Sequence, residues 1–166
     1  IQTVFVDLNS QVLRYGPGNN PVILYGDKLT IEDFHITNIY LTDNDNLSSN
    51  EPIVALGASS PMGMVTLRHA TVDTLVQPGT PSGNINVTLF GARATIAAAI
   101  GPFTLDDVSV LTSALTHTSG TSYVIAHLSP GSIVKNCHIL GDGAFTSGIK
   151  TGGAPRAQIL RNEIIR

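Results

Sequence analysis

Two adjacent carboxyl groups, those of Asp106 and Asp107, are the side chains in this sequence whose types and spacing best suit catalysis. Two carboxyl groups roughly 5–9.5 Å apart can break a glycosidic bond, because one protonates the leaving oxygen while the other acts as base or nucleophile. Asp106 and Asp107 are therefore candidate catalytic residues for an enzyme that cleaves polysaccharides.

The other reactive side chains point to no metal site and no cofactor. The five histidines show none of the short spacings that are typical of metal ligands. They are His35, His69, His117, His127 and His138. Cys137 is the only cysteine, which excludes an intrachain disulfide, and we expect it to be a small buried side chain.

Composition narrows the partners that we expect. Only 13% of the residues are charged and the net charge is −3, so nothing predicts binding to nucleic acid. The longest weakly polar stretch, residues 92–100, is too short to span a membrane. Tryptophan is absent, which leaves Tyr15, Tyr40 and Tyr123 as candidate contacts for a sugar.

A hexapeptide that occurs five times is the feature that must position these side chains. Each copy reads apolar, charged, polar, variable, variable, apolar. The copies are residues 31–36, 67–72, 105–110, 134–139 and 160–165. A short strand-like run precedes each copy, and the runs are residues 22–26, 53–57, 87–91, 124–128 and 148–152. A two-strand unit repeated in this way predicts a β-solenoid of about five rungs, because no unit can bury its apolar face alone.

The third position of the hexapeptide predicts a sharp corner in the backbone. Two polar residues separate the apolar positions there instead of one, as at Glu32 and Asp33. Asn and Asp tolerate the left-handed conformation that such a corner requires. The residues that we place in this corner ladder are Asp33, His69, Asp107, Asn136 and Asn162.

On these repeats, residues 22–165 resemble the right-handed parallel β-helix proteins, which include pectate lyases, polygalacturonases and phage tailspikes. Asp106 and Asp107 are similar to the paired aspartates of polygalacturonases, and residues 148–151 are similar to that family's downstream Arg-Ile-Lys segment, with Gly148 in place of Arg. The family's Gly-His-Gly motif is absent, since Ala126 and Leu128 flank His127, and its Asn-Thr-Asp element is also absent.

The sequence therefore predicts one all-β domain over residues 1–166, as part of a longer chain or an assembly. An antiparallel β-sandwich or jelly roll is the alternative fold, because it is also built from short alternating strands. The resemblance implies a homotrimeric structural component of a virion or cell-surface appendage, which displays loops for attachment to other virion proteins or to a cell-surface glycan. The alternative function is a polysaccharide hydrolase or lyase that uses Asp106 and Asp107.

Overall fold

In the computed structural model the chain is all-β, and neighbouring strands run parallel throughout the described residues. The structure describes residues 2–7, 13–15, 22–36, 39–41, 52, 54–72, 75–76, 87–92, 101–111, 122–126, 128–140 and 147–165. One isolated antiparallel bridge joins Ala58 to Gly101. Parallel pairing of this extent replaces the antiparallel sandwich that the composition also allowed.

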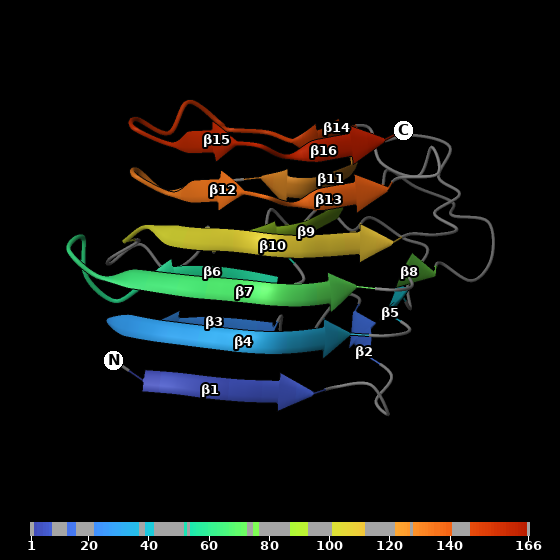
Figure 1. Cartoon of the computed structure of the whole chain (residues 1–166), viewed down its shortest axis with the longest axis horizontal. Helices are drawn as coiled ribbons and strands as arrows, with labels where there is room; N and C mark the ends of the chain where they lie inside the picture. The colour runs from blue at the N-terminus through green and yellow to red at the C-terminus, as the bar shows by residue number, and fades with distance from the viewer. Residues whose placement is uncertain are drawn as a thin grey trace.

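The largest sheet contains eight strands and carries all five hexapeptides (Figure 1). We call its successive positions rows, numbered from the N-terminus. The rows are β1 (Gln2–Asp7), β4 (Lys28–Ile36), β7 (Met64–Val72), β10 (Phe103–Leu111), β12 with β13 (Ile133–Lys135 and His138–Leu140), and β15 with β16 (Gln158–Leu160 and Glu163–Ile165). Each row is thus the chain's next return to the same sheet.

Two smaller parallel sheets accompany the rows. The second sheet contains β3 (Val22–Gly26), β6 (Val54–Ala58), β9 (Val87–Gly91), β11 (Ser122–Ala126) and β14 (Ser147–Ile149). The third sheet contains β2 (Leu13–Tyr15), β5 (Ile39–Leu41) and β8 (Leu75–Val76). From β1 to β9 the chain therefore visits the first, third and second sheets in a fixed rotation.

The pairing register aligns equivalent residues of successive rows into columns. Ile31 pairs with Leu67, Leu67 with Leu105, and Leu105 with Val134. In β7 the side chains before the corner alternate between buried and half-buried, as expected for a strand with one face toward a core. The columns at the two ends of the hexapeptide are apolar and point inward.

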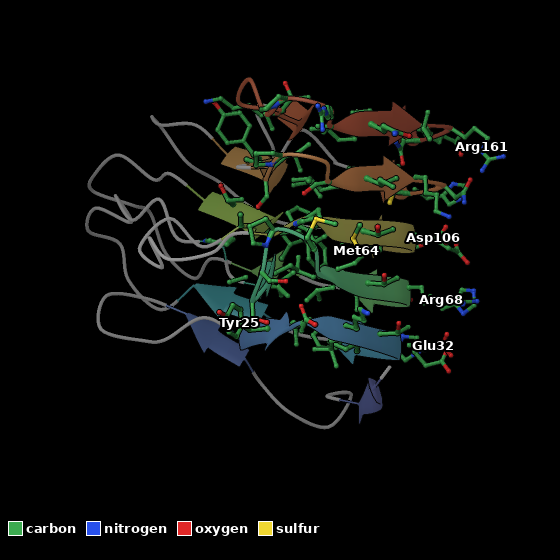
Figure 2. The ribbon with its side chains drawn as sticks, turned by 90° about the vertical axis from the view of Figure 1, so that its left-hand side faces the viewer. Tyr25, Glu32, Met64, Arg68, Asp106 and Arg161 are labelled. Carbon is green, nitrogen blue, oxygen red and sulfur yellow. The ribbon has the colours of Figure 1, made fainter. Side chains whose placement is uncertain are left out.

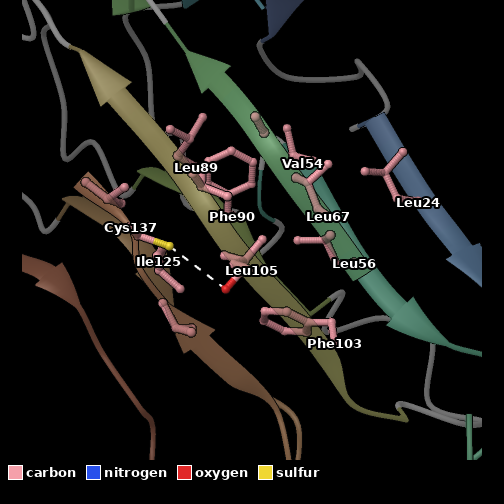
Figure 3. Packing of buried hydrophobic residues seen from close by; sticks show 14 of the residues in the cluster. Leu24, Val54, Leu56, Leu67, Leu89, Phe90, Phe103, Leu105, Ile125 and Cys137 are labelled. Atoms are coloured by element: carbon pink, nitrogen blue, oxygen red, sulfur yellow. Dashed lines mark hydrogen bonds between the residues drawn. The ribbon is translucent and has the colours of Figure 1, made fainter. Parts of the chain in front are cut away.

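The core lies between the first and second sheets (Figure 3). Phe103 and Leu105 of β10 belong to the same buried cluster as Leu56 of β6 and Phe90 of β9. Burying one such side chain contributes about 1.5–3 kcal/mol. The cluster runs from β4 to β13, so these rows are buried by their neighbours as well as by the facing sheet.

The turns that lead from the second sheet into the first are tied to each other across rows. The Ser60 hydroxyl donates a hydrogen bond of 2.7 Å to Asp27 Oδ1. The Met64 amide donates to the Asp27 carbonyl at 2.8 Å. Asp27 precedes β4 and Met64 begins β7, so these contacts hold two adjacent rows in register.

The structure adds two features that the sequence did not predict. The N-terminal strand β1 is a further row, which pairs with β4 although it carries no hexapeptide. The third sheet consists of strands of only two or three residues. The predicted run 124–128 corresponds to Ser122–Ala126 and the run 148–152 to Ser147–Ile149. In the described part of the run 53–57, the strand is Val54–Ala58.

Candidate functional site

The hexapeptides bend at a column of residues with left-handed backbone, which we call the corner column. The φ angles are 54° at Asp33, 51° at His69, 58° at Asp107, 54° at Asn136 and 52° at Arg161. Holding an L-residue in this region costs roughly 1–2 kcal/mol, and Asn and Asp adopt it most readily. Asp107 therefore has a structural reason to be Asp.

The fifth member of the predicted corner ladder was wrong. The sequence placed Asn162 there, but the register pairs Lys135 with Leu160 and His138 with Glu163, which puts Arg161 at the corner. The hexapeptide in the last row is shifted by one residue. Ile159–Leu160 and Ile164–Ile165 are both apolar pairs, so a slip of one residue leaves the binary pattern unchanged.

Asn162 instead occupies the inward column of Val108 and Cys137, where its amide bonds to the row beneath. Its Oδ1 accepts a hydrogen bond of 2.9 Å from the Cys137 amide. Its Nδ2 donates to the Val134 carbonyl at 3.0 Å. The side chain thus satisfies two backbone groups on either side of the Asn136 corner.

The second position of the hexapeptide forms an outward column of alternating charge, which we call the charge column. It reads Glu32, Arg68, Asp106, Lys135 in consecutive rows. Arg68 Nη1 lies 3.1 Å from Glu32 Oε1, and Lys135 Nζ lies 3.0 Å from Asp106 Oδ2. Figure 2 shows Glu32, Arg68 and Asp106 stacked along the same edge of the molecule. The alternation of sign in the sequence was the signal that could have predicted these ion pairs.

Asp106 is held as a carboxylate by its neighbours. Its Oδ1 also accepts a hydrogen bond of 2.8 Å from Asn136 Nδ2. Burial is the largest single influence on the pKa of Asp106 and would raise it, but the hydrogen bonds from Lys135 and Asn136 oppose it. The positive charges of Lys135 and Arg68 act in the same direction as these hydrogen bonds, and together they hold the pKa below its ordinary value.

Asp107 differs from Asp106 in its backbone conformation, its exposure and its ion-pair partner. It stands at the corner, its side chain is exposed, and its Oδ2 lies 3.7 Å from Nε2 of His69 one row below. A general acid for glycoside cleavage needs a raised pKa, and the surroundings of Asp106 lower it. The arrangement gives both aspartates structural partners, and a catalytic role for them stays a prediction.

Three of the five histidines, His35, His69 and His138, lie in the described residues. His35 and His138 share one outward column, three rows apart, and His138 Nδ1 lies 3.1 Å from Oε2 of Glu163. His117 and His127 fall outside the described residues. Within the described part of the chain, no three His, Cys, Asp or Glu side chains gather closely enough to hold a metal ion.

Cys137 lies fully buried in the same inward column as Phe34, Ala70 and Val108. Its Sγ is 3.3 Å from the Lys135 carbonyl and 4.0 Å from the Leu105 carbonyl, the contact drawn in Figure 3. Burial raises the pKa of this thiol to about 11. A thiol held in its protonated form is a poor nucleophile, so the side chain acts here as a small core residue.

Of the three tyrosines considered as sugar contacts, only Tyr123 has a described side chain. The Lys150 ammonium lies 4.6 Å from the centre of its ring and donates a hydrogen bond of 3.2 Å to its hydroxyl. Lys150 belongs to the segment 148–151 that is similar to the polygalacturonase motif. In this structure it packs on Tyr123, which occupies the adjacent strand of the second sheet.

No helix in the described residues is both long and apolar enough to cross a membrane. Comparison of the chain with families of known proteins, with curated proteins and with solved structures finds no match.

Proposed function

We propose that the chain is a right-handed parallel β-solenoid that serves as a structural element of a virion or cell-surface appendage. Parallel pairing, the fixed rotation through three sheets and the columns of equivalent residues all support a solenoid. The handedness and the tailspike-like setting follow from the resemblance of the hexapeptides to β-helix proteins.

The observation that supports a mechanical role is that the outward polar side chains bond to side chains of the neighbouring rows. Along the charge column, Glu32 bonds to Arg68, and Asp106 bonds to both Lys135 and Asn136. At the C-terminal end His138 bonds to Glu163. Each of these contacts joins one row to the next. In an enzyme, the catalytic side chains would contact the substrate. Here these polar side chains contact neighbouring rows instead.

In this proposal the chain functions as a homotrimer on a virion or an extracellular surface, with loops displayed to other virion proteins or to a cell-surface glycan. A surface with few charged residues suits burial against sister chains, since only 13% of the sequence is charged. Light scattering of the purified chain tests this part. A stable mass of three chains supports the trimer, and a monomer at every concentration contradicts it.

A polysaccharide hydrolase or lyase remains the competing proposal, with Asp106 and Asp107 as its acidic pair. The two proposals differ in what Asp106→Asn does. For a scaffold we expect a loss of about 1 kcal/mol in the free energy of unfolding at pH 7, because the charge-assisted bond to Lys135 is lost. Asp107→Asn makes the same change at the next residue and serves as the control. It should change the free energy of unfolding little.

The pH dependence of unfolding follows from the direction of the pKa shift. The pKa of Asp106 is lower in the folded chain, so its carboxylate stabilises the fold above the unfolded pKa. That stabilisation is lost as the pH falls through the folded pKa. We therefore expect a shallower acid-induced loss of stability in Asp106→Asn than in the unaltered chain, measured by denaturant titration between neutral and acidic pH.

Release of sugar fragments from acidic and neutral polysaccharides is the decisive second readout. A scaffold releases none, with or without the substitutions. Fragment release that disappears in Asp106→Asn or Asp107→Asn, in variants that keep the circular dichroism spectrum of the unaltered chain, would establish the enzyme and overturn the scaffold.

A further inference from the structure

The charge column presents its side chains to solvent in a regular order of sign. In the rows β4, β7, β10 and β12 it is negative, positive, negative and positive, at Glu32, Arg68, Asp106 and Lys135. These side chains are 24–42% exposed. Figure 2 shows Glu32, Arg68 and Asp106 pointing away from the body of the molecule. This face of the first sheet therefore offers a line of alternating charges to a partner.

Within the chain these charges form two separate ion pairs. Glu32 pairs with Arg68, and Asp106 pairs with Lys135. Among the described residues, Glu32 is the only carboxylate in ion-pair contact with Arg68, through Nη1. A guanidinium carries five N–H donors. In the middle of the column, Arg68 therefore keeps donors for a carboxylate of another molecule.

A second copy of this chain carries the complementary line of charges when its stack runs in the opposite direction. Reversing the order of the column places Lys135 of one copy opposite Glu32 of the other. The same reversal places Asp106 opposite Arg68. A shift by one row would place like charges opposite each other, so the alternation of sign fixes the register. The centre of the contact then lies between β7 and β10.

We propose that the charge column binds the charge column of a second copy, in an antiparallel pair whose two-fold axis runs along the strands between β7 and β10. A two-fold contact is self-complementary, because residue i contacts residue j and j contacts i. Each charge then has an opposite charge across the contact and opposite charges beside it in its own column. This inference rests on the charge column and does not depend on the proposed role in a virion.

The columns on either side of the charge column are compatible with the same axis. Because the axis runs along the strands, each column faces itself with its rows reversed. In the corner column, His69 of one copy lies opposite Asp107 of the other, and these side chains are 48% and 51% exposed. In the column two residues before the charge column, Thr66 lies opposite Thr104, and both are uncharged. The pairing therefore brings no like charges together in β7 and β10 at these columns.

Parallel chains could not use this face with equal rows side by side. Around a three-fold axis, rows of the same number meet, so Glu32 of one chain would approach Glu32 of the next. Like charges brought together at a contact are unfavourable. A lateral trimer of parallel chains would therefore form through another face. The presence or absence of that trimer does not decide whether the antiparallel pair forms.

A carbodiimide cross-link tests the direction of the pair. The reagent joins a carboxylate to an ammonium without a spacer, so it links only groups that touch. Glu32 and Lys135 of one chain are three rows apart, which separates their backbones by about 14 Å and exceeds the reach of their side chains. We expect a covalent dimer in which mass spectrometry finds Glu32 of one copy linked to Lys135 of the other.

Reversal of the two central charges provides a stricter test. Arg68→Glu would face Asp106 of the second copy, so the yield of the link between Glu32 and Lys135 should fall by more than about tenfold. Asp106→Arg should have the same effect. Mixing the two variants should restore the link, because the introduced Glu of one faces the introduced Arg of the other. The unaltered Arg68 and Asp106 of that mixed pair also face each other.

Lys150→Glu is the matched control, because it makes the same change of charge at an exposed residue that follows β14 of the second sheet. It should leave the yield of the link unchanged. Circular dichroism and thermal unfolding verify that each variant is folded before it is mixed. If Asp106→Arg does not fold, the comparison of Arg68→Glu with Lys150→Glu decides the question.

Three results would overturn the inference. One is the absence of a link between Glu32 and Lys135 in the unaltered chain at every concentration. Another is an equal loss of the link in Arg68→Glu and Lys150→Glu, which indicates a general effect of net charge. The third is a failure of the two folded variants to restore the link when they are mixed.

Discussion

The fourth row, β10, and the C-terminal row, β15 with β16, have the same pattern of inward apolar residues but opposite environments. In β10, Leu105 is 0% and Val110 is 1% exposed. Their counterparts Ile159 and Ile164 at the end of the stack are 39% and 49% exposed. Residue type and strand position are similar in the two rows. Among the described strands, β10 pairs with a row on each side, whereas β15 and β16 pair with a row on one side.

The comparison separates the direction in which a side chain points from the depth at which it is buried. Which side of a strand faces inward is set locally, by the alternation of apolar and polar residues. How deeply a residue is buried is set by its neighbours in space. Stability in a stack of this kind is therefore expected to reside in the interfaces between rows, and the end rows contribute least.

The largest effect should come from truncating the same column in the two regions. Leu105→Ala removes a fully buried side chain and should lower the free energy of unfolding by about 2–5 kcal/mol. Ile159→Ala should cost less than about 1.5 kcal/mol, because much of its side chain already contacts water. Denaturant titration of both variants measures the difference. Equal losses would contradict the unequal burial of the two rows.

An intermediate effect is expected at Asn162, the residue that ties the end row to the row below. Asn162→Ala leaves the Cys137 amide and the Val134 carbonyl without their side-chain partner and should cost about 1–3 kcal/mol. Gln158→Ala, in the same row, is an exposed control that should change stability little. If both variants match the unaltered chain in thermal unfolding, Asn162 does not hold the end row.

The smallest effect concerns a feature that the two regions share, the left-handed corner. Asp107→Gly and Arg161→Gly should each leave stability unchanged or raise it by up to about 1 kcal/mol, because glycine accepts positive φ without strain. Ser109→Gly, within β10, should lower stability by about 0.5–1 kcal/mol. Corner effects that differ in sign between Asp107 and Arg161 would show that the strain is not a local property of the backbone.

Repetition explains how much of the fold could be predicted. The hexapeptides predicted four rows in the observed register and the fifth with a shift of one residue, because apolar positions around two polar residues form a local pattern. Strand β1 was missed since it has Phe5 opposite Glu32 and an irregular register between Phe5 and Asp7. The third sheet was missed because strands as short as Leu75–Val76 carry no periodicity.

The candidate site was predicted less well, because its contacts depend on register between rows. The corner at Asp107 could be expected from residue preferences alone. The alternation of sign at the second position of the hexapeptide could have indicated the ion pair of Lys135 with Asp106. The hydrogen bond from Asn136 to Asp106 could not be expected, since it joins residues 30 positions apart that only the pairing of β10 with β12 brings together. At Arg161 a single slip in register was enough to move the corner by one residue.

Hydrogen exchange of the dilute chain, followed by mass spectrometry, tests the layered stack most directly. Amides of β10, which pair on both sides, should exchange slowly, while those of β15 and β16, which pair on one side, should exchange much faster. Protection should decrease from β10 through β12 and β13 to the last row. Equal protection in β10 and β16 at concentrations where the chain does not associate would contradict the stack.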